Sequence, residues 1–458
     1  MTDPRDQRIA ELERQVAQLT QLVLSLKEQL DRNSGNSNKP PSSDSPDQRA
    51  ERRGKDGTGR TRGGQPGHRG SKRELVPPEQ VSEVKPLFPS ECENCFVALP
   101  QKPTTAVELF QTVELPLVKP VVTEWQRYSV TCPCCRHETW ASVADIPLTP
   151  FGPRLSAVIG LLTGVYHLSR RASVSLLSDV LGVTISLGGV SAVEERVSEA
   201  VKPAVAEAWE RVNAAPVKHT DGTSWFQAGV MCALWTLASS AATVFKILAN
   251  GKATTLAPLF GKRLGILVSD RGTALNFWVM EKRQICWAHL LRKAISFSER
   301  DGPSGRFGRE LLDYIGVLFD YWDQHRAGQL SRERLREVMA PVRLQVEKLL
   351  ERAAAAKLPH VSGSCEDILA HRAALWTFVD QDGVEPTNNH AERELRSFVL
   401  WRKRSFGTQS ERGNLFAERL MTVAHTARKQ NRNVLEFLTA CCVAARGGAA
   451  PPSLFASA

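Results

Sequence analysis

The sequence holds two groups of side chains that commonly bind metal ions, carboxylates and thiols. Asp221 ends a short expected strand, Asp270 ends an apolar one, and Glu392 lies in the first turn of an expected helix. Carboxylates at neighbouring strand ends can share one divalent cation, and a third acid from a helix can complete a site for two cations. The three acids therefore predict a divalent-metal site.

Glu392 belongs to an informative stretch, PTNNHAERELRSFVLWRKRSFGTQSER, at residues 386–412. Asn388 and Asn389 can cap the start of this helix, because short polar side chains satisfy its free backbone N–H groups. A structural role for Glu392 stays open at this point. It could close a capping box with Asn389 or form an ion pair with Arg396.

Four other acids compete with Glu392 for the third position. Glu394 lies two residues further on, about 200° around the helix axis, so only one of the two glutamates can face the site. Glu385 precedes the helix, while Asp380 and Asp382 fall in the loop before the cap. The choice is therefore mainly between the two faces of one helix.

Basic side chains surround the candidate acid on the same helix. An acid beside a basic surface suits a protein that holds a metal ion against a phosphate backbone. We expect five residues to contact these phosphates: Arg393, Arg396, Arg402, Lys403 and Arg404.

The thiols form two CxxC pairs, Cys92 with Cys95 and Cys132 with Cys135. Tetrahedral structural zinc takes four such ligands, so the two pairs predict one zinc ion. The second pair is accompanied by a spare thiol and by an alternative ligand, Cys134 and His137.

The segments between the two CxxC pairs alternate enough to be strands. Residues 110–115 and 121–130 show this alternation. A zinc-ribbon domain is therefore expected over residues 81–150.

Composition narrows the class of protein. The chain has 458 residues, too many for one compact core, and 42% of them are hydrophobic. Lys and Arg outnumber Asp and Glu by 59 to 49, and this net charge of +10 favours a polyanionic partner.

The start of the chain and its cysteines indicate where the protein acts. The charged start MTDPRDQR has no apolar signal segment, and the cysteines cluster as metal ligands do, so we expect the protein to be cytoplasmic. The uncharged segment 222–245 is expected to form a buried hairpin instead of a membrane span.

A helix with a narrow apolar seam is predicted at residues 5–32. This seam favours a coiled coil over residues 1–32 and self-association of the chain, although the helix could also dock on its own chain. The apolar residues recur at alternating spacings of three and four: Ile9, Leu12, Val16, Leu19, Val23, Leu26 and Leu30.

Residues 33–80 are expected to form a disordered linker. The first part is rich in Ser, Asn and Pro, and residues 49–73 form a basic, glycine-rich arm. Such an arm can follow phosphates without reading sequence, or it can be a solvated linker.

The helical segment 151–215 has the layout of a helix-turn-helix. Gly182 falls in the turn, and the second helix begins near Ser186. This second helix carries several acids, which suit the DNA major groove poorly.

Strand patterns begin at residue 216 and position two of the acids. The charged helical segment 300–382 is expected to be an insertion before the helix of Glu392, and the tail 446–458 is expected to be disordered. The predicted strands are a three-stranded meander at 217–221, 231–237 and 243–248, followed by strands at 265–270 and 284–287.

These motifs, in this order, resemble the insertion-sequence-66 family of bacterial transposases. The resemblance covers nearly the whole chain and is carried by the coiled coil, KPPSSD, GGQPGHRG, the paired CxxC knuckles, CWAHLLRKA and NNHAERELRSFVLWRKRSFGTQSERG. One departure is Gly222, which follows Asp221 where the family commonly has glutamate.

The resemblance implies an α/β fold with a ribonuclease H-like catalytic core over residues 216–445. In that core Asp221, Asp270 and Glu392 would be a DDE triad that holds two Mg²⁺ ions for strand cleavage and strand transfer on DNA. It also implies a homo-oligomer in the bacterial cytoplasm, associated with the nucleoid when bound, that acts on the element's inverted repeats and on target DNA, with accessory proteins of the same element. An inactive DNA-binding regulator and a ribonuclease H-like nuclease remain alternatives.

Overall fold

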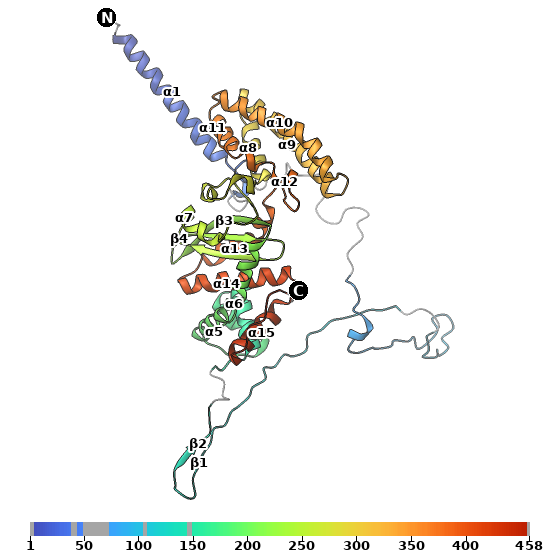
Figure 1. Ribbon diagram of the computed structural model, residues 1–458. Helices are drawn as coiled ribbons and strands as arrows, with labels where there is room; N and C mark the ends of the chain where they lie inside the picture. The colour runs from blue at the N-terminus through green and yellow to red at the C-terminus, as the bar shows by residue number, and fades with distance from the viewer. Residues whose placement is uncertain (1–3, 38–43, 49–72, 104–107, 144–148, 456–458) are drawn as a thin grey trace. The chain divides into compact units, whose positions relative to one another are not determined.

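A computed structural model describes residues 4–37, 44–48, 73–103, 108–143 and 149–455 (Figure 1). The fold is mixed α/β, as predicted. Contacts divide the chain into a smaller unit, residues 50–120, and a larger unit of residues 1–49 and 121–458. This division falls inside the segment 81–150 that was expected to form one zinc ribbon.

A five-stranded sheet forms the centre of the larger unit, with the strand order β5-β4-β3-β6-β7. The first three strands along the chain form the predicted antiparallel meander, and β6 and β7 run parallel to β3. The strands are β3 (Val217–Gln227), β4 (Val230–Ala238), β5 (Thr243–Leu248), β6 (Ile266–Ser269) and β7 (Arg283–Ile285).

The prediction that the first strand ends at Asp221 was wrong. β3 continues to Gln227, which pairs with Val230 of β4. The connecting residues Ala228 and Gly229 both have positive φ, 49° and 81°, which suits a tight hairpin turn. Asp221 therefore lies within a long strand, where its pairing with Thr236 of β4 fixes its backbone.

Two helices cover one face of the sheet, α13 (Asn389–Ser405) and α14 (Glu411–Lys429). The apolar residues of α13 recur at helical spacing and therefore form one buried stripe. The stripe consists of Leu395, Phe398 and Trp401, and it packs on Trp225, Leu234 and Phe245 of the sheet. In Figure 1, α14 lies between the sheet and the helices α5 and α6, in agreement with its contacts.

A larger core includes residues from the opposite face of the sheet, from α14, and from the helices before and after the sheet. Leu237, Val244 and Leu267 belong to this core. The helices are α3 (Pro153–Gly160), which continues as a π-helical turn at Leu161–Val165, α4 (Arg170–Leu181), α5 (Leu187–Ala200), α6 (Lys202–Ala214), α7 (Ala253–Leu256) and α15 (Val434–Gly447).

The expected helix-turn-helix layout is observed in α4 and α5. Gly182 ends α4 with a left-handed conformation, and the Ser186 hydroxyl accepts the N–H of Gly189 at the start of α5. The acids of α5 are engaged within the fold, which leaves this helix poorly suited to a DNA groove. They pair with arginines of α4 and α14: Glu194 with Arg170, Glu195 with Arg412, and Glu199 with Arg419.

The segment between β7 and α13 is helical and has its own core. Figure 1 shows α9 and α10 side by side, and they pack against each other and against α8 and α11. The helices are α8 (Trp287–Ser298), α9 (Gly302–Arg326), α10 (Arg332–Ala355), α11 (Ser362–Ala370) and α12 (Thr377–Asp380). Short 3-10 turns lie at 78–80, 257–260, 273–275, 280–282 and 372–374.

The expectation of a disordered C-terminal tail was wrong for residues 448–455. Leu454 is fully buried in the larger core, and its N–H donates to Glu207 of α6 at 2.9 Å. Arg211 lies over the ring of Phe455, 5.3 Å from its centroid. Two adjacent apolar side chains, Leu454 and Phe455, therefore dock this segment on the larger core.

The predicted linker also begins with ordered structure. Asn36 donates to Glu299, which directly follows α8, at 2.8 Å, and the carboxylate of Asp44 accepts bonds from Ser34. The basic arm at 49–72 lies outside the described residues.

The strands expected at 110–115 and 121–130 are largely absent from the described segment 108–143. Only β1 (Ser129–Thr131) and β2 (Glu138–Trp140) pair there, around the second CxxC pair. An alternating segment becomes a strand only where a partner supplies the ladder of hydrogen bonds.

The first helix, α1 (Pro4–Asp31), presents its apolar seam to solvent. Ile9, Leu19 and Leu30 are 55%, 60% and 78% exposed. None of the helices in the described ranges combines the length and the apolarity that crossing a bilayer requires.

We predict that Leu19→Asp with Leu26→Asp weakens self-association, because a coiled-coil seam would have to bury both charges. Sedimentation should show a smaller species than the wild type. Gln18→Asp, on another face of α1, is the matched control and should leave the assembly unchanged. The same oligomer with and without residues 1–32 would show that this helix does not mediate assembly.

Candidate active site

The sheet places Asp221 and Asp270 next to each other. β3 and β6 run parallel, with Val217 opposite Ile266 and His219 opposite Val268. Continuing this register by two residues sets Asp221 opposite Asp270, which directly follows β6. The two candidate acids therefore meet at one sheet edge, as the sequence predicts.

Backbone N–H groups fix the orientation of both carboxylates. Asp221 Oδ1 accepts the N–H of Gly222, and Asp270 Oδ1 accepts that of Gly272, each at 2.9 Å. A Cβ at Gly222 would lie 3.0 Å from two atoms of the Trp235 indole. Trp235 thus occupies the space that a larger residue at 222 would need.

Asn388 joins the start of α13 to the sheet beside Asp221. Its side chain is fully buried, and its Nδ2 donates to the carbonyl oxygen of Thr220 at 2.8 Å. Its Oδ1 lies 3.3 Å from His219 Nδ1, and its backbone N–H donates to Cys286 Sγ at 3.1 Å. The prediction of a side-chain cap was therefore wrong: Asn388 occupies the cap position, but its side chain bonds across to β3.

Glu392 is directed to the same edge from the first turn of α13. Its Oε1 lies 3.9 Å from His289 Nδ1 and 3.9 Å from Arg292 Nη2, both on α8. Within the described residues, this oxygen is buried without a hydrogen-bond partner, and Glu392 forms no ion pair with Arg396. The capping and ion-pair roles considered for Glu392 are not those it has in this fold.

Glu394 points to the opposite side of α13 and is already paired. It lies 3.0 Å from Lys429 and 3.6 Å from His390, and it is hydrogen-bonded to His425. Burial opposes its ionisation, but the His425 hydrogen bond and the Lys429 charge outweigh this and lower the pKa of Glu394 to about 2. This carboxylate holds α13 on α14 and faces away from the aspartates.

The remaining rival acids lie away from the sheet edge or have other partners. Glu385 is exposed. Asp380 and Asp382 form ion pairs with Arg336 and Arg332 of α10, at 3.4 Å and 3.0 Å. Glu392 is therefore the acid of this helix region that faces Asp221 and Asp270.

Electrostatics show how closely the three acids interact. Burial and the charges of Asp270 and Glu392 raise the pKa of Asp221 from 3.8 to about 7. Together with the unpartnered Oε1 of Glu392, this repulsion is what a divalent cation would relieve. The donor set, three carboxylates, fits Mg²⁺.

We predict that the stability of the protein without added Mg²⁺ falls as pH rises from about 4 to about 7. The pKa of Asp221 is raised on folding, so the folded state holds this proton more tightly and loses stability as the proton leaves. Mg²⁺ should therefore raise the melting temperature more at pH 8 than at pH 5. Each kcal/mol that Mg²⁺ adds to the free energy of unfolding should raise the melting temperature by about 2–4 °C. Asp221→Asn should lose most of this pH dependence, and an equal Mg²⁺ effect in both proteins would contradict the interpretation.

The basic residues of α13 divide into two groups. Arg402 is half-buried and donates to Thr223 Oγ1 at 3.0 Å and to Ser224, so it holds α13 on β3. Burial also lowers its pKa. The exposed members that remain as candidates for phosphate contact are Arg393, Arg396, Lys403 and Arg404.

Three residues near the site were not singled out from the sequence: Cys286, His289 and Arg292. Cys286, His289 and Glu392 each place one potential ligand atom within 4.8 Å of the others, the one such group of three in the described ranges. Burial and the nearby Arg292 lower the pKa of His289 to about 4, so the imidazole is neutral at pH 7. The signal was the CWAHLLRKA motif, which was used only for the family resemblance.

Each CxxC pair forms the same compact turn. The N–H groups of Phe96 and Arg136 donate to the carbonyl oxygens of Cys92 and Cys132, both at 2.9 Å. Both donor residues have positive φ, 57° and 61°. Hydrogen bonds, chiefly from backbone N–H groups inside each turn, lower the pKa of Cys92 and of Cys132. This geometry favours thiolates, although the two turns belong to different compact units.

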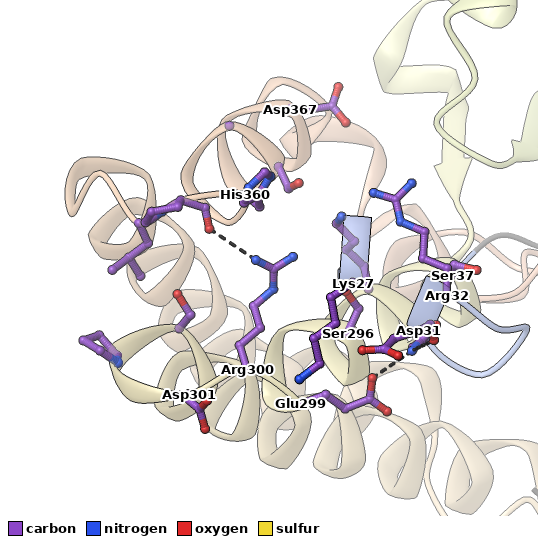
Figure 2. A pocket seen from close by; sticks show the side chains of 18 of the residues that line it. Lys27, Asp31, Arg32, Ser37, Ser296, Glu299, Arg300, Asp301, His360 and Asp367 are labelled. Atoms are coloured by element: carbon purple, nitrogen blue, oxygen red, sulfur yellow. Dashed lines mark hydrogen bonds between the residues drawn. The ribbon is translucent and has the colours of Figure 1, made fainter. Parts of the chain in front are cut away.

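A cavity of about 1540 Å³ opens beside α8 (Figure 2). Figure 2 shows Lys27 and Arg32 on one side and Ser296 and His360 on others. The lining also includes Arg271 and His289, so the cavity extends to the residues around Glu392. Its charges are mixed, since Asp31, Glu299, Asp301 and Asp367 line it too.

Two family models match parts of the chain. A family described as one of unknown function, DUF6444, matches residues 1–74. No match was found among curated proteins. The model of the transposase IS66 family matches residues 149–415, more than half of the 458 residues, and this span includes all three acids. The chain therefore belongs to the IS66 family of transposases, as the sequence motifs predict.

Proposed function

We propose that this transposase is of the DDE type and cleaves and joins DNA strands at the ends of an insertion sequence. Asp221, Asp270 and Glu392 would be its metal-binding catalytic acids. The observation that carries the proposal is their convergence at one sheet edge, beside a helix with exposed basic residues. The strand order, a meander followed by two strands parallel to its first strand, supports a ribonuclease H-like core.

The chain's own residues would hold the metal ions and orient the carboxylates that bind them. Asp221, Asp270 and Glu392 would hold two Mg²⁺ ions, which supply Lewis acidity at the phosphate when bound. Water attacks phosphorus, the bond to the 3′-oxygen breaks, and a 3′-hydroxyl is released. That hydroxyl then attacks a target phosphodiester, with release of the target's own 3′-hydroxyl. Asn388 and the N–H groups of Gly222 and Gly272 keep the carboxylates oriented throughout.

Basic residues of α13 and the four CxxC cysteines would also have roles. Arg393, Arg396, Lys403 and Arg404 would contact DNA phosphates, whereas Arg402 would act mainly within the fold. Cys92, Cys95, Cys132 and Cys135 would share one structural Zn²⁺, and the common turn of the two CxxC pairs supports this.

Assembly follows from the reaction. Two element ends must be processed together, so we propose a homo-oligomer formed through the exposed seam of α1. It would act in the cytoplasm on inverted repeats and target DNA, with accessory proteins of the element.

Products on DNA distinguish this function from its alternatives. The purified protein would be incubated with Mg²⁺ and the inverted repeats that flank its own gene. We expect 3′-hydroxyl ends at the repeat termini, followed by their joining to a second DNA. Cleavage without joining would indicate a nuclease, and binding without cleavage would indicate an inactive regulator.

A further inference from the structure

The start of α8 is fixed at the same sheet edge as the three acids. The N–H of Cys286 donates to the carbonyl oxygen of Ser269 at 2.9 Å, and that of Trp287 to Pro386 at 2.8 Å. The first two turns of α8 therefore have a set position between β6 and the start of α13. His289 and Arg292 lie in these turns.

Polar atoms of both residues approach Glu392 without bonding to it. His289 Nδ1 and Arg292 Nη2 each lie 3.9 Å from Glu392 Oε1, which is too far for a hydrogen bond. In the described part of the chain, His289 Nδ1, Arg292 Nε and Glu392 Oε1 are all buried without partners. Buried polar atoms are nearly always paired in folded proteins, so unpartnered atoms on three neighbouring side chains indicate a missing ligand near Glu392.

The charges of the neighbouring groups narrow the chemistry of that ligand. Arg292 supplies a fixed positive charge close enough to act on Asp221. The His289 side chain is only 13% exposed, and its Nδ1 can carry a proton and donate a hydrogen bond. Two donors beside three metal-binding carboxylates match a phosphodiester, whose oxygens need metal ions on one side and hydrogen-bond donors on the other.

A soft transition metal bound by Cys286, His289 and Glu392 is the competing occupant. The Cys286 Sγ is buried and accepts the N–H of Asn388 at 3.1 Å. A metal ion would leave the buried Nε of Arg292 without a partner, whereas a phosphate oxygen could accept a hydrogen bond from it.

We propose that His289 and Arg292 bind the non-bridging oxygens of the phosphate that is cleaved. The role rests on the proposed cleavage function and adds two catalytic residues to it. His289 also lines the cavity beside α8, so this point is open to a ligand from that side.

The test compares Arg292→Ala, Arg292→Lys and His289→Ala with the wild type in single-turnover cleavage. Arg292→Ala should slow cleavage by roughly 10²–10³-fold, and Arg292→Lys should recover part of this loss. DNA affinity measured in Ca²⁺ and Mn²⁺ affinity measured by electron paramagnetic resonance should each stay within about twofold of wild type, because few of the phosphate contacts and none of the metal ligands are lost. Lys282→Ala, an exposed charge before β7, is the control and should cleave normally.

Sulfur substitution separates contact with the phosphate from a structural role. One stereoisomer of a phosphorothioate at the cleaved position should slow the wild type, and this stereospecific effect should shrink in Arg292→Ala. Thermal melting would show whether Arg292→Ala is folded. If it is not, the cleavage rate and the thio effect of Arg292→Lys would test the phosphate contact instead.

Three results would overturn the assignment. Normal cleavage by both alanine variants would remove the role while leaving the proposed function intact. A thio effect in Arg292→Ala equal to that of the wild type would do the same. Loss of Mn²⁺ affinity in His289→Ala together with slow cleavage by Cys286→Ser would establish the metal site instead. Absence of cleavage by the wild type itself would overturn the proposed function first.

Discussion

Replacing Asp221, Asp270 or Glu392 by the matching amide should abolish strand cleavage, with losses of about 10³-fold or more in each case. The amides keep the volume of the side chains but remove the charge that binds Mg²⁺. Because the three acids act as one unit, double variants should be scarcely slower than single ones. Single-turnover cleavage of DNA carrying the element ends provides the measurement.

Stability and DNA binding should respond differently from activity. Asp221→Asn removes a carboxylate whose ionisation is opposed by burial and by its neighbours, so the Mg²⁺-free protein should melt at a higher temperature. DNA binding should survive in all three variants, because it depends on contacts between basic side chains and phosphates.

Glu385→Gln is the matched control for Glu392→Gln, since Glu385 is exposed just before the same helix. It should cleave at the wild-type rate. Glu394→Ala is not a neutral control, because Glu394 is buried against Lys429 and His425 and holds α13 in place. A Glu392→Gln protein that cleaves normally in Mg²⁺ would contradict the assignment of the third acid.

Loss of structural zinc should have the second-largest effect. The double variant Cys92→Ser with Cys132→Ser removes one ligand from each CxxC pair, and it should bind no zinc and lose the fold of this region. Zinc in comparable small sites contributes about 10–16 kcal/mol of apparent binding free energy, so no other change in this region should match it.

Metal analysis of the purified proteins tests this directly. The wild type should contain one equivalent of zinc bound through thiolates. Cys134→Ser should keep it, because Cys134 is the spare thiol of the second pair. Full zinc content in the Cys92→Ser/Cys132→Ser protein would show that the two pairs do not form the site.

Local patterns predicted the elements well where packing is regular. The apolar segments 231–237 and 243–248, read as the arms of a hairpin, correspond to β4 and β5, and Asp221 and Asp270 fall at adjacent positions of the sheet. The length of β3 could not be read in the same way, because residues beyond Asp221 become a strand only through pairing with β4.

Long-range partners explain most of the errors. Asn388 is a good capping residue by type, yet its side chain bonds to Thr220, 168 residues away in the chain. Helix geometry predicted that Glu392 and Glu394 face opposite sides of α13. It could not show which of them faces α14, because this depends on the pairing of Glu394 with His425 and Lys429 of α14. Leu454 looked like part of a tail because its partner is on α6.

The most direct measurement of the central claim is the fate of the 3′ end in Mg²⁺. Wild-type protein, labelled DNA with the element's inverted repeats, and an unlabelled target circle would be incubated together, with Glu392→Gln and Glu385→Gln in parallel. We expect labelled 3′ ends joined to the circle by wild type and Glu385→Gln, and no cleavage or joining by Glu392→Gln. Joining by Glu392→Gln at the wild-type rate, or no cleavage by the wild type, would contradict it.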